Sequence, residues 1–391
     1  MVNKRQATIL VIICALAAKL QRLPSLVSYT VGRDGYIVFF MLGLFDVLFL
    51  MLAIWFFNRN NNKGTLKDVL DNSYGTVVSR ILLFMLFCYF MIIAVLPSVA
   101  IRDLFANILF DQINYNYFGL IFLFVIIFMA VKGLQTLGRQ GEIYVGILAF
   151  SVIGVLLLGL SSTRLERILP VLDIDYEILI GEMLRDTLWF GDYMILYFLS
   201  GRVSLKKNEK LGAGLVIPYA VVVLVIIPLA YVVFYTIYNN LAGFQTNAIS
   251  SLTQFSLLTL DIGRIDWFLV LFEQISTILA SSIYILIAST CFCQAFSIKK
   301  PMIPIIIFAT AIFVVDLFVF SNINTSMPQY RQFFYIYSMI VIYLLPFVFT
   351  IASLIFQKKL NKNEIKKPKN IKKGATNNVS LAKSKKEAMN D

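Results

Sequence analysis

Histidine is absent from this chain of 391 residues, and charged residues make up only 14% of it. A soluble domain of this size carries closer to a quarter charged residues. Because histidine is the commonest metal ligand and general base, its absence excludes cysteine–histidine sites. The P-loop, Gly-x-Ser-x-Gly and His-Glu-x-x-His motifs are missing as well. The sequence therefore indicates no enzyme, and we expect no metal and no cofactor.

Cysteine is also scarce, and its four positions suggest packing. All four lie inside apolar runs: Cys14, Cys88, Cys291 and Cys293. The Cys-x-Cys pair is too closely spaced for a zinc knuckle and has no histidine to join it. We therefore interpret the cysteines as buried structural thiols.

Apolar runs dominate what is present, since 59% of the residues are hydrophobic. A run of about twenty apolar residues crosses the hydrocarbon core of a membrane as a helix. The runs show no strand-like alternation, which excludes a β-barrel. We predict an all-α polytopic membrane protein with ten spans: Ala7–Thr30, Gly35–Phe57, Val77–Ala100, Phe118–Val131, Glu142–Leu160, Ile178–Leu199, Gly212–Tyr238, Ile265–Phe296, Met302–Phe320 and Phe333–Phe356.

The lysines and arginines predict the orientation. With the first residues in the cytoplasm, the inner loops hold fourteen cations and the outer loops six. The positive-inside rule then places both termini in the cytoplasm. No cleavable signal peptide is apparent. We expect a bacterial inner-membrane protein, in a spore or a cell, with a permease-like domain at 1–357 and a basic disordered tail at 358–391.

The lysines of this tail account for most of the net charge of +12, so no nucleic-acid partner is needed to explain it. A polybasic tail beside a membrane can contact the anionic lipids of the bilayer. The simpler alternative is that it only fixes the topology and remains disordered.

The stretch "ALAAKLQRLPSLV" interrupts the first apolar run with charges and a proline. A charge at mid-membrane is costly unless it is paired or hydrated, and Pro24 cannot continue the hydrogen bonding of a helix. One interpretation is a broken helix whose break is lined by Lys19 and Gln21. The other is a proline kink with Lys19 and Arg22 reaching the interface.

The sixth span favours the broken helix, because it has Gly191 and Asp192 in its middle. Two interrupted spans at positions one and six of ten are what a five-plus-five inverted repeat predicts, with a ligand bound between them at the midplane. Lys19 is then expected to pair with Asp192, and Glu273 of the eighth span is a second possible partner. Asp46 is equally well explained by a structural hydrogen bond to a neighbouring helix.

Four motifs resemble the spore germination permease family, the membrane-embedded B subunits of spore germinant receptors. The order and spacing of these motifs with the ten spans carry the resemblance: "LPSLVSYTVGRDGYIVFFMLGL" from Leu23, "VKGLQTLGRQGEI" from Val131, "LERILPVL" from Leu165 and "FGDYMILYFL" from Phe190. This family belongs to the amino acid–polyamine–organocation transporter superfamily. The resemblance implies a LeuT-like fold with broken helices 1 and 6, and recognition of a small germinant, commonly an amino acid, in a complex with A and C subunits.

Together, the residues and the resemblance predict a subunit that binds a germinant and triggers spore germination. The alternative is a secondary amino acid transporter coupled to protons or ions. A third hypothesis is that the protein is a channel or a lipid-handling protein. The candidate ligand-binding residues are Ala17, Ala18, Lys19, Gln21, Tyr89, Phe190, Gly191, Asp192, Tyr193, Glu273 and Thr277. For the aromatic residues among them, ordinary helix packing is the competing explanation.

Overall fold

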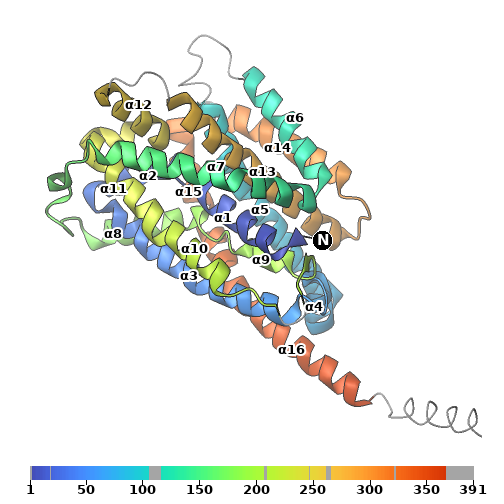
Figure 1. The fold of residues 1–391 in the computed structure, drawn as a ribbon. Helices are drawn as coiled ribbons and strands as arrows, with labels where there is room; N and C mark the ends of the chain where they lie inside the picture. Colours follow the sequence, from blue (N-terminus) through green and yellow to red (C-terminus); the bar gives the residue numbers. More distant parts are fainter. Residues whose placement is uncertain are drawn as a thin grey trace, which may run out of the picture.

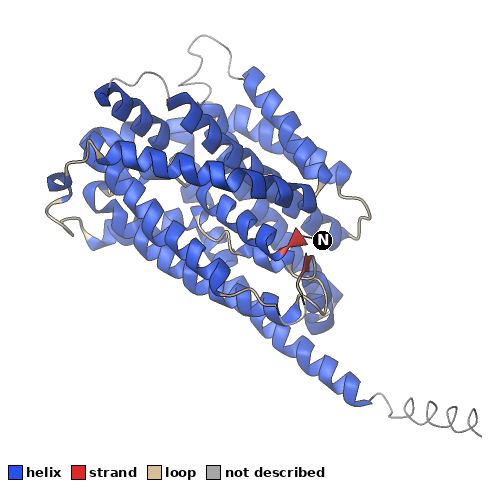
Figure 2. Ribbon diagram, viewed as in Figure 1, coloured by secondary structure: helices blue, strands red, loops and turns tan. Residues whose placement is uncertain are grey.

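The computed structural model describes residues 2–17, 19–104, 116–206, 209–245, 247–260, 266–320 and 323–366. In this part of the chain nearly all regular structure is helical (Figure 2). The exceptions are two strands of two residues each, β1 (Val2–Asn3) and β2 (Val203–Ser204), which pair in parallel.

Six of the predicted spans are single helices close to their expected bounds. They are α3 (Gly35–Asn60), α5 (Thr76–Leu104), α6 (Asn116–Lys132), α7 (Leu134–Leu160), α13 (Asp266–Phe296) and α14 (Met302–Val319). Each coincides with a long apolar run, because in a lipid environment every backbone polar group of such a run must be satisfied within its own helix.

The predicted first and sixth spans are each interrupted. The first consists of α1 (Lys4–Ala17) and α2 (Leu23–Thr30). The sixth consists of α8 (Tyr176–Asp186), the 3-10 turn η4 (Thr187–Trp189) and α9 (Met194–Leu199). Pro24 is the second residue of α2, where its missing N–H is not needed by the helix. The prediction of broken helices at these two positions is confirmed.

Two further spans contain a π-helical segment. In the seventh, η5 (Val222–Ile226) joins α10 (Ala213–Val221) to α11 (Ile227–Tyr238). In the last, η7 (Ile340–Leu344) joins α15 (Ile323–Met339) to α16 (Leu345–Lys366). Because α16 continues to Lys366, the chain is still helical beyond residue 357, where we expected the membrane domain to end. Most of the predicted tail lies outside the described residues.

Seven helical stretches in the described residues are long and apolar enough to cross a membrane. The helix Gly119–Lys132 is apolar but shorter, and the two interrupted spans consist of short pieces. The structure thus supports a polytopic all-α membrane protein, whereas ten crossings and an internal repeat stay predictions.

The prediction omitted several short elements that connect the spans. They are η1 (Gly32–Asp34), α4 (Leu66–Tyr74), η3 (Leu165–Ile168), η6 (Asn239–Phe244) and α12 (Ala248–Leu260). Of these, α4 begins with a capping box in which the side chains and backbone N–H groups of Thr65 and Asp68 bond reciprocally. Such a cap starts a helix without an apolar run.

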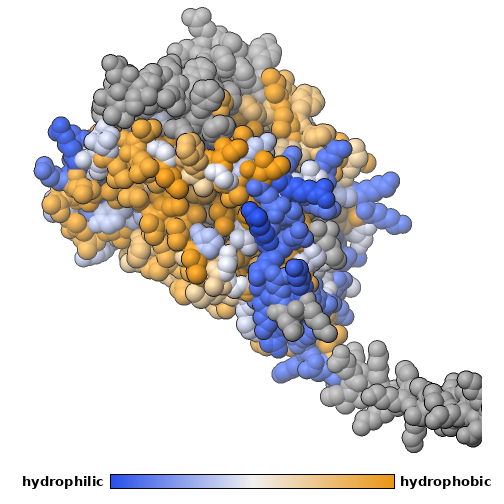
Figure 3. Space-filling model, viewed as in Figure 1, coloured by the Kyte–Doolittle hydropathy of each residue, from blue (hydrophilic) through white to orange (hydrophobic). Residues whose placement is uncertain are grey.

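The helix α13 lies in the interior and packs against α1, α5, α6 and α7 (Figure 1). In contrast, large apolar side chains are exposed on outer helix faces, among them Phe124 on α6, Phe150 on α7 and Phe318 on α14. Figure 3 shows this apolar surface between a large hydrophilic end near β1, α4 and α16 and a smaller hydrophilic area opposite. Apolar surface of this extent is expected where lipid covers a protein.

The hydrophilic end brings the first described residues together with two later segments. Residues of β1 pair with β2, which follows α9, and Lys63 donates a hydrogen bond to the side chain of Gln357 on α16. The start of the chain and the end of α16 therefore lie at the same end of the molecule (Figure 1).

Candidate functional site

The two interrupted spans meet at a buried ion pair. Lys19 lies between α1 and α2, and its ammonium group donates a hydrogen bond to Asp192, which lies between η4 and α9. The two residues are only 2% and 5% exposed. The Lys19 Nζ atom also lies 4.8 Å from the centroid of the Phe190 ring. The predicted pairing of Lys19 with Asp192 is confirmed, and the alternative, a kinked helix with Lys19 at the interface, is wrong.

The break in the sixth span depends on a glycine. Gly191 has a φ of +95°, in the region that L-residues rarely adopt, and a Cβ there would lie 2.7 Å from the Tyr89 hydroxyl oxygen. The freed backbone groups find partners on neighbouring helices. The Tyr89 hydroxyl donates to the Phe190 carbonyl oxygen at 3.0 Å, and the Gly191 N–H donates to Asp46 at 2.8 Å. Hydrogen bonds of this kind allow non-helical backbone at membrane depth.

Asp46 of α3 is a second carboxylate beside Lys19. Its Oδ2 atom lies 4.0 Å from the Lys19 Nζ atom and accepts a hydrogen bond from the Tyr219 hydroxyl of α10 at 2.6 Å. The expected hydrogen bond to a neighbouring helix is therefore confirmed. Asp46 also has a role that we did not predict, because it places a second negative charge next to the ion pair and holds the Gly191 backbone.

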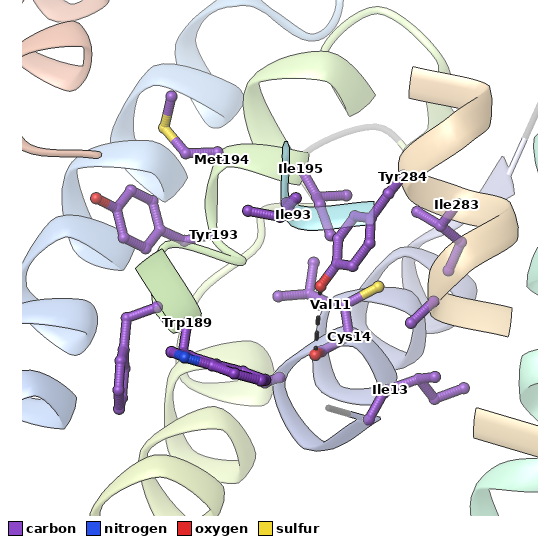
Figure 4. Packing of buried hydrophobic residues seen from close by; sticks show 14 of the residues in the cluster. Val11, Ile13, Cys14, Ile93, Trp189, Tyr193, Met194, Ile195, Ile283 and Tyr284 are labelled. Atoms are coloured by element: carbon purple, nitrogen blue, oxygen red, sulfur yellow. Dashed lines mark hydrogen bonds between the residues drawn. The ribbon is translucent and has the colours of Figure 1, made fainter. Parts of the chain in front are cut away.

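A small cavity with a free volume of about 20 Å³ lies beside the ion pair. It is lined by Cys14, Lys19, Tyr89, Ile93, Leu96, Pro97, Leu188, Trp189, Phe190, Asp192 and Tyr284. Figure 4 shows Tyr284 pointing from α13 toward Cys14 of α1; its hydroxyl lies 2.6 Å from Asp192 Oδ1 and 3.5 Å from the Cys14 carbonyl oxygen. The buried Trp189 indole N–H has no partner among the described residues. The cavity thus combines one cation and one anion with aromatic and aliphatic walls.

A model of spore germination proteins matches residues 1–326 of the chain. The chain belongs to the spore germination protein family. No curated protein matches it. Because the family match runs from the start of the chain into α15, it includes both interrupted spans and every residue that lines the cavity. The family and the apolar helices together identify a spore germination permease embedded in a membrane.

Four of the residues that we predicted for this permease line the cavity: Lys19, Tyr89, Phe190 and Asp192. Ala17 is the last residue of α1 and is buried. Gly191 forms the break itself, and Tyr193 points elsewhere, since its hydroxyl donates to the Ile342 carbonyl oxygen of η7 at 2.5 Å. Ala18 lies outside the described residues. A ligand-binding role for these residues stays a prediction.

The other three predicted residues lie together at a different place. The Gln21 side-chain amide donates to the Thr277 hydroxyl at 2.9 Å, and Thr277 is one helical turn after Glu273 on α13. None of the three lines the cavity beside Lys19. The expectation that Glu273 is a second partner of Lys19 is wrong, because Glu273 forms no ion pair with any described residue.

We did not predict Tyr219, Trp189 and Tyr284 as residues of the site. For Tyr284 a signal was present: it lies seven residues after Thr277, and residues seven apart share a helix face. Trp189 directly precedes the predicted Phe190. For Tyr219 we find no signal, because it lies in an apolar run and contacts Asp46 only through the packing of α10 on α3.

Proposed function

We propose that this spore germination permease is the membrane subunit of a germinant receptor. It binds a small germinant, an amino acid, in the cavity between the two interrupted spans. The observation that carries the proposal is the Lys19–Asp192 ion pair, which is buried at both helix breaks and lines that cavity. Charged residues in a membrane interior are expensive and are retained for function.

The chemistry of the cavity matches the proposed ligand. The ammonium group of an amino acid suits Asp192, and its carboxylate suits Lys19. The aromatic and aliphatic side chains on α5, η4 and α13 suit a small apolar side chain. Because the cavity has a free volume of only about 20 Å³, an amino acid enters it only when Lys19 and Asp192 separate. That separation also changes how the halves of the broken spans are held.

Signal transfer then follows from a shift between two conformations, since a ligand favours the state that it binds more tightly. In this proposal the shift is passed to A and C receptor subunits. The protein lies in a bacterial inner membrane, with the hydrophilic end that holds β1, α4 and α16 in the cytoplasm. That end carries Lys4, Lys63 and Lys359, in agreement with the positive-inside rule.

The test uses spores in which this chain and its A and C partners form the only germinant receptor. Single amino acids are added, and germination is followed by the loss of optical density. We expect wild-type spores to respond to at least one amino acid and Asp192→Asn spores to respond to none. The control is Asp173→Asn, which changes a carboxylate that is 54% exposed and pairs with Arg33 at the surface. Normal germination of the Asp192→Asn spores would overturn the proposal.

The second candidate function is a secondary amino acid carrier, coupled to protons or ions. Two interrupted helices that meet at a charged site are also how many carriers build a substrate site. Uptake of a radiolabelled amino acid into liposomes distinguishes the two candidates. A carrier accumulates the amino acid inside, whereas a receptor subunit only binds it.

A further inference from the structure

A second cavity lies at the hydrophilic end of the molecule and is far larger than the one beside Lys19. It is an open groove with a free volume of about 450 Å³, against about 20 Å³ beside Lys19. Its lining comes from α1, α7 and α10 and from the segment that connects β2 to α10. The helix α1 packs against both α7 and α10, and Figure 1 shows it between them. Small-molecule sites have volumes of about 300–1,000 Å³, so this groove can hold a ligand without rearrangement.

The polar part of the groove carries an excess of positive charge. Among the described residues that line it, Lys4 and Arg5 are the cations and Glu209 is the anion. The Glu209 carboxylate is already held, since it lies 3.5 Å from the Lys4 Nζ atom and accepts a hydrogen bond from the Lys206 N–H at 3.2 Å. Arg5 is exposed and forms no ion pair with any described residue. The groove therefore presents a guanidinium group without a counter-charge, which suits a ligand with one negative charge.

The other part of the groove is apolar. Ile9 lies one helical turn after Arg5 on the same face of α1, about 6 Å further along the axis, and Val145 lines the groove from α7. The wall helices also carry large apolar side chains on their outer faces, since Phe150 of α7 is 68% exposed and Ile217 of α10 is 62% exposed. Figure 3 shows the hydrophilic side chains of this end directly bordered by the apolar surface. A ligand in the groove therefore meets charge on one side and hydrocarbon on the other.

We propose that this groove binds an anionic phospholipid. Its phosphate group lies against Arg5 and Lys4, and an acyl chain follows Ile9 and Val145. A guanidinium group matches the geometry of phosphate oxygens, and basic pockets between membrane helices bind anionic lipid head groups. A soluble anion or an acidic peptide would leave the apolar part of the groove uncovered, whereas a lipid covers both parts.

Bound in this place, the lipid holds the start of α1 against α7 and α10. Because α1 ends at Ala17, two residues before Lys19, its position affects where the Lys19 ammonium group lies. The strand β1 directly precedes α1 and pairs with β2, which follows α9 of the other interrupted span. The lipid thus stabilises the arrangement in which the two spans meet. This inference does not rest on the proposed germinant, because the groove shares no lining residue with the cavity beside Lys19.

The experiment measures thermal unfolding of the purified full-length chain in a non-ionic detergent, without any amino acid. Phosphatidylglycerol, or phosphatidylcholine with the same acyl chains, is added in increasing amounts. We expect phosphatidylglycerol to raise the midpoint by several degrees, growing with the logarithm of its concentration, and phosphatidylcholine to have little effect. Arg5→Gln should abolish most of the rise. The control Arg80→Gln should keep it, since Arg80 is an exposed cation of α5 that does not line the groove.

A second variant fills the groove without changing any charge. A Cβ at Gly214 of α10 meets no atom within 4 Å, so Gly214→Leu places a larger side chain in the groove and should also remove the rise. Its control is Gly181→Leu in α8, where a Cβ is equally free and the residue does not line the groove.

Equal rises with the two lipids would overturn the proposal, as would an unchanged rise in either Arg5→Gln or Gly214→Leu. An equal rise with glycerol 3-phosphate, a soluble anion without acyl chains, would also overturn it, because the groove would then recognise only the phosphate group.

Discussion

Lys19 and Asp192 are 173 residues apart in the sequence and form a buried ion pair where two spans are interrupted. The pair joins two broken helices, and in the proposed function it also binds the ligand. Removing one partner leaves the other charge of the pair buried without it, whereas removing both leaves only Asp46, which keeps its hydrogen bonds from Tyr219 and Gly191. This asymmetry allows mutations to separate the structural role of the pair from its proposed role in ligand binding.

The first prediction concerns this pair. Lys19→Met and Asp192→Asn should each lower the free energy of unfolding by about 3–5 kcal/mol, and the double variant should lose less than the sum. Chemical unfolding in detergent gives the interaction energy through a double-mutant cycle. Additive losses would show that the two charges do not stabilise each other.

The second prediction concerns the break at Gly191. Gly191→Ala should destabilise the protein by about 1–3 kcal/mol or more, because the positive φ strains an L-residue and the new Cβ collides with Tyr89 and Ile342. The matched control is Gly146→Ala in α7, where a Cβ meets no atom within 4 Å. Since alanine favours a helix, the control should be neutral or stabilising. Equal effects of both variants would contradict the role of Gly191.

The third prediction compares two buried tyrosines. Tyr219→Phe removes a hydrogen bond to the Asp46 carboxylate and should lower stability by about 1.5–3 kcal/mol. Tyr197→Phe removes a hydroxyl that is buried without a partner and should be neutral or stabilising. Thermal unfolding of the two variants side by side tests the pair. A greater loss of stability in Tyr197→Phe than in Tyr219→Phe would show that the hydrogen bond from Tyr219 to Asp46 does not stabilise the protein.

The fourth prediction concerns a buried cation next to the sixth span. Arg331 of α15 forms ion pairs with both Glu182 and Asp186 at the end of α8. Arg331→Met should therefore cost about 3–5 kcal/mol, because it leaves the buried Asp186 without its cation and Glu182 with only the partly exposed Arg185. Arg185→Met is the control: its side chain is 46% exposed and lies 3.8 Å from Glu182, so its loss should be at most about 1 kcal/mol. Equal shifts of the two unfolding curves would show that the buried Arg331 stabilises the protein no more than the partly exposed Arg185.

The sequence predicted the membrane helices well because a span needs a long apolar run, and such runs are visible without neighbours. It missed α4 and α12, which are short and partly polar. It also missed the π-helical segments η5 and η7. Each segment is followed two residues later by a proline, Pro228 or Pro346. A proline removes a helical hydrogen bond from the preceding turn, but it does not by itself distinguish a π-helical segment from a kink.

Within the candidate site, the sequence revealed the residues whose presence in a membrane is expensive. Lys19 and Asp192 were found in this way, and their pairing followed from opposite charge. Asp46 satisfies the same criterion, but a lone carboxylate is also explained by one hydrogen bond, so its place beside Lys19 could not be predicted. The roles of Tyr89 and Tyr193 differ only through the directions of their side chains, since one faces the cavity and the other faces η7.

The most direct test of the account is amino acid binding to the Lys19→Met, Asp192→Asn double variant. This variant lacks both charges of the pair, and Asp46 keeps its hydrogen bonds from Tyr219 and Gly191. It should therefore fold, which its unfolding curve can verify. Wild type and double variant are each titrated with a panel of amino acids while the thermal midpoint is recorded. We expect a selective rise of the midpoint in the wild type and none in the folded double variant. An equal rise in both would show that the ligand binds elsewhere and would contradict the account.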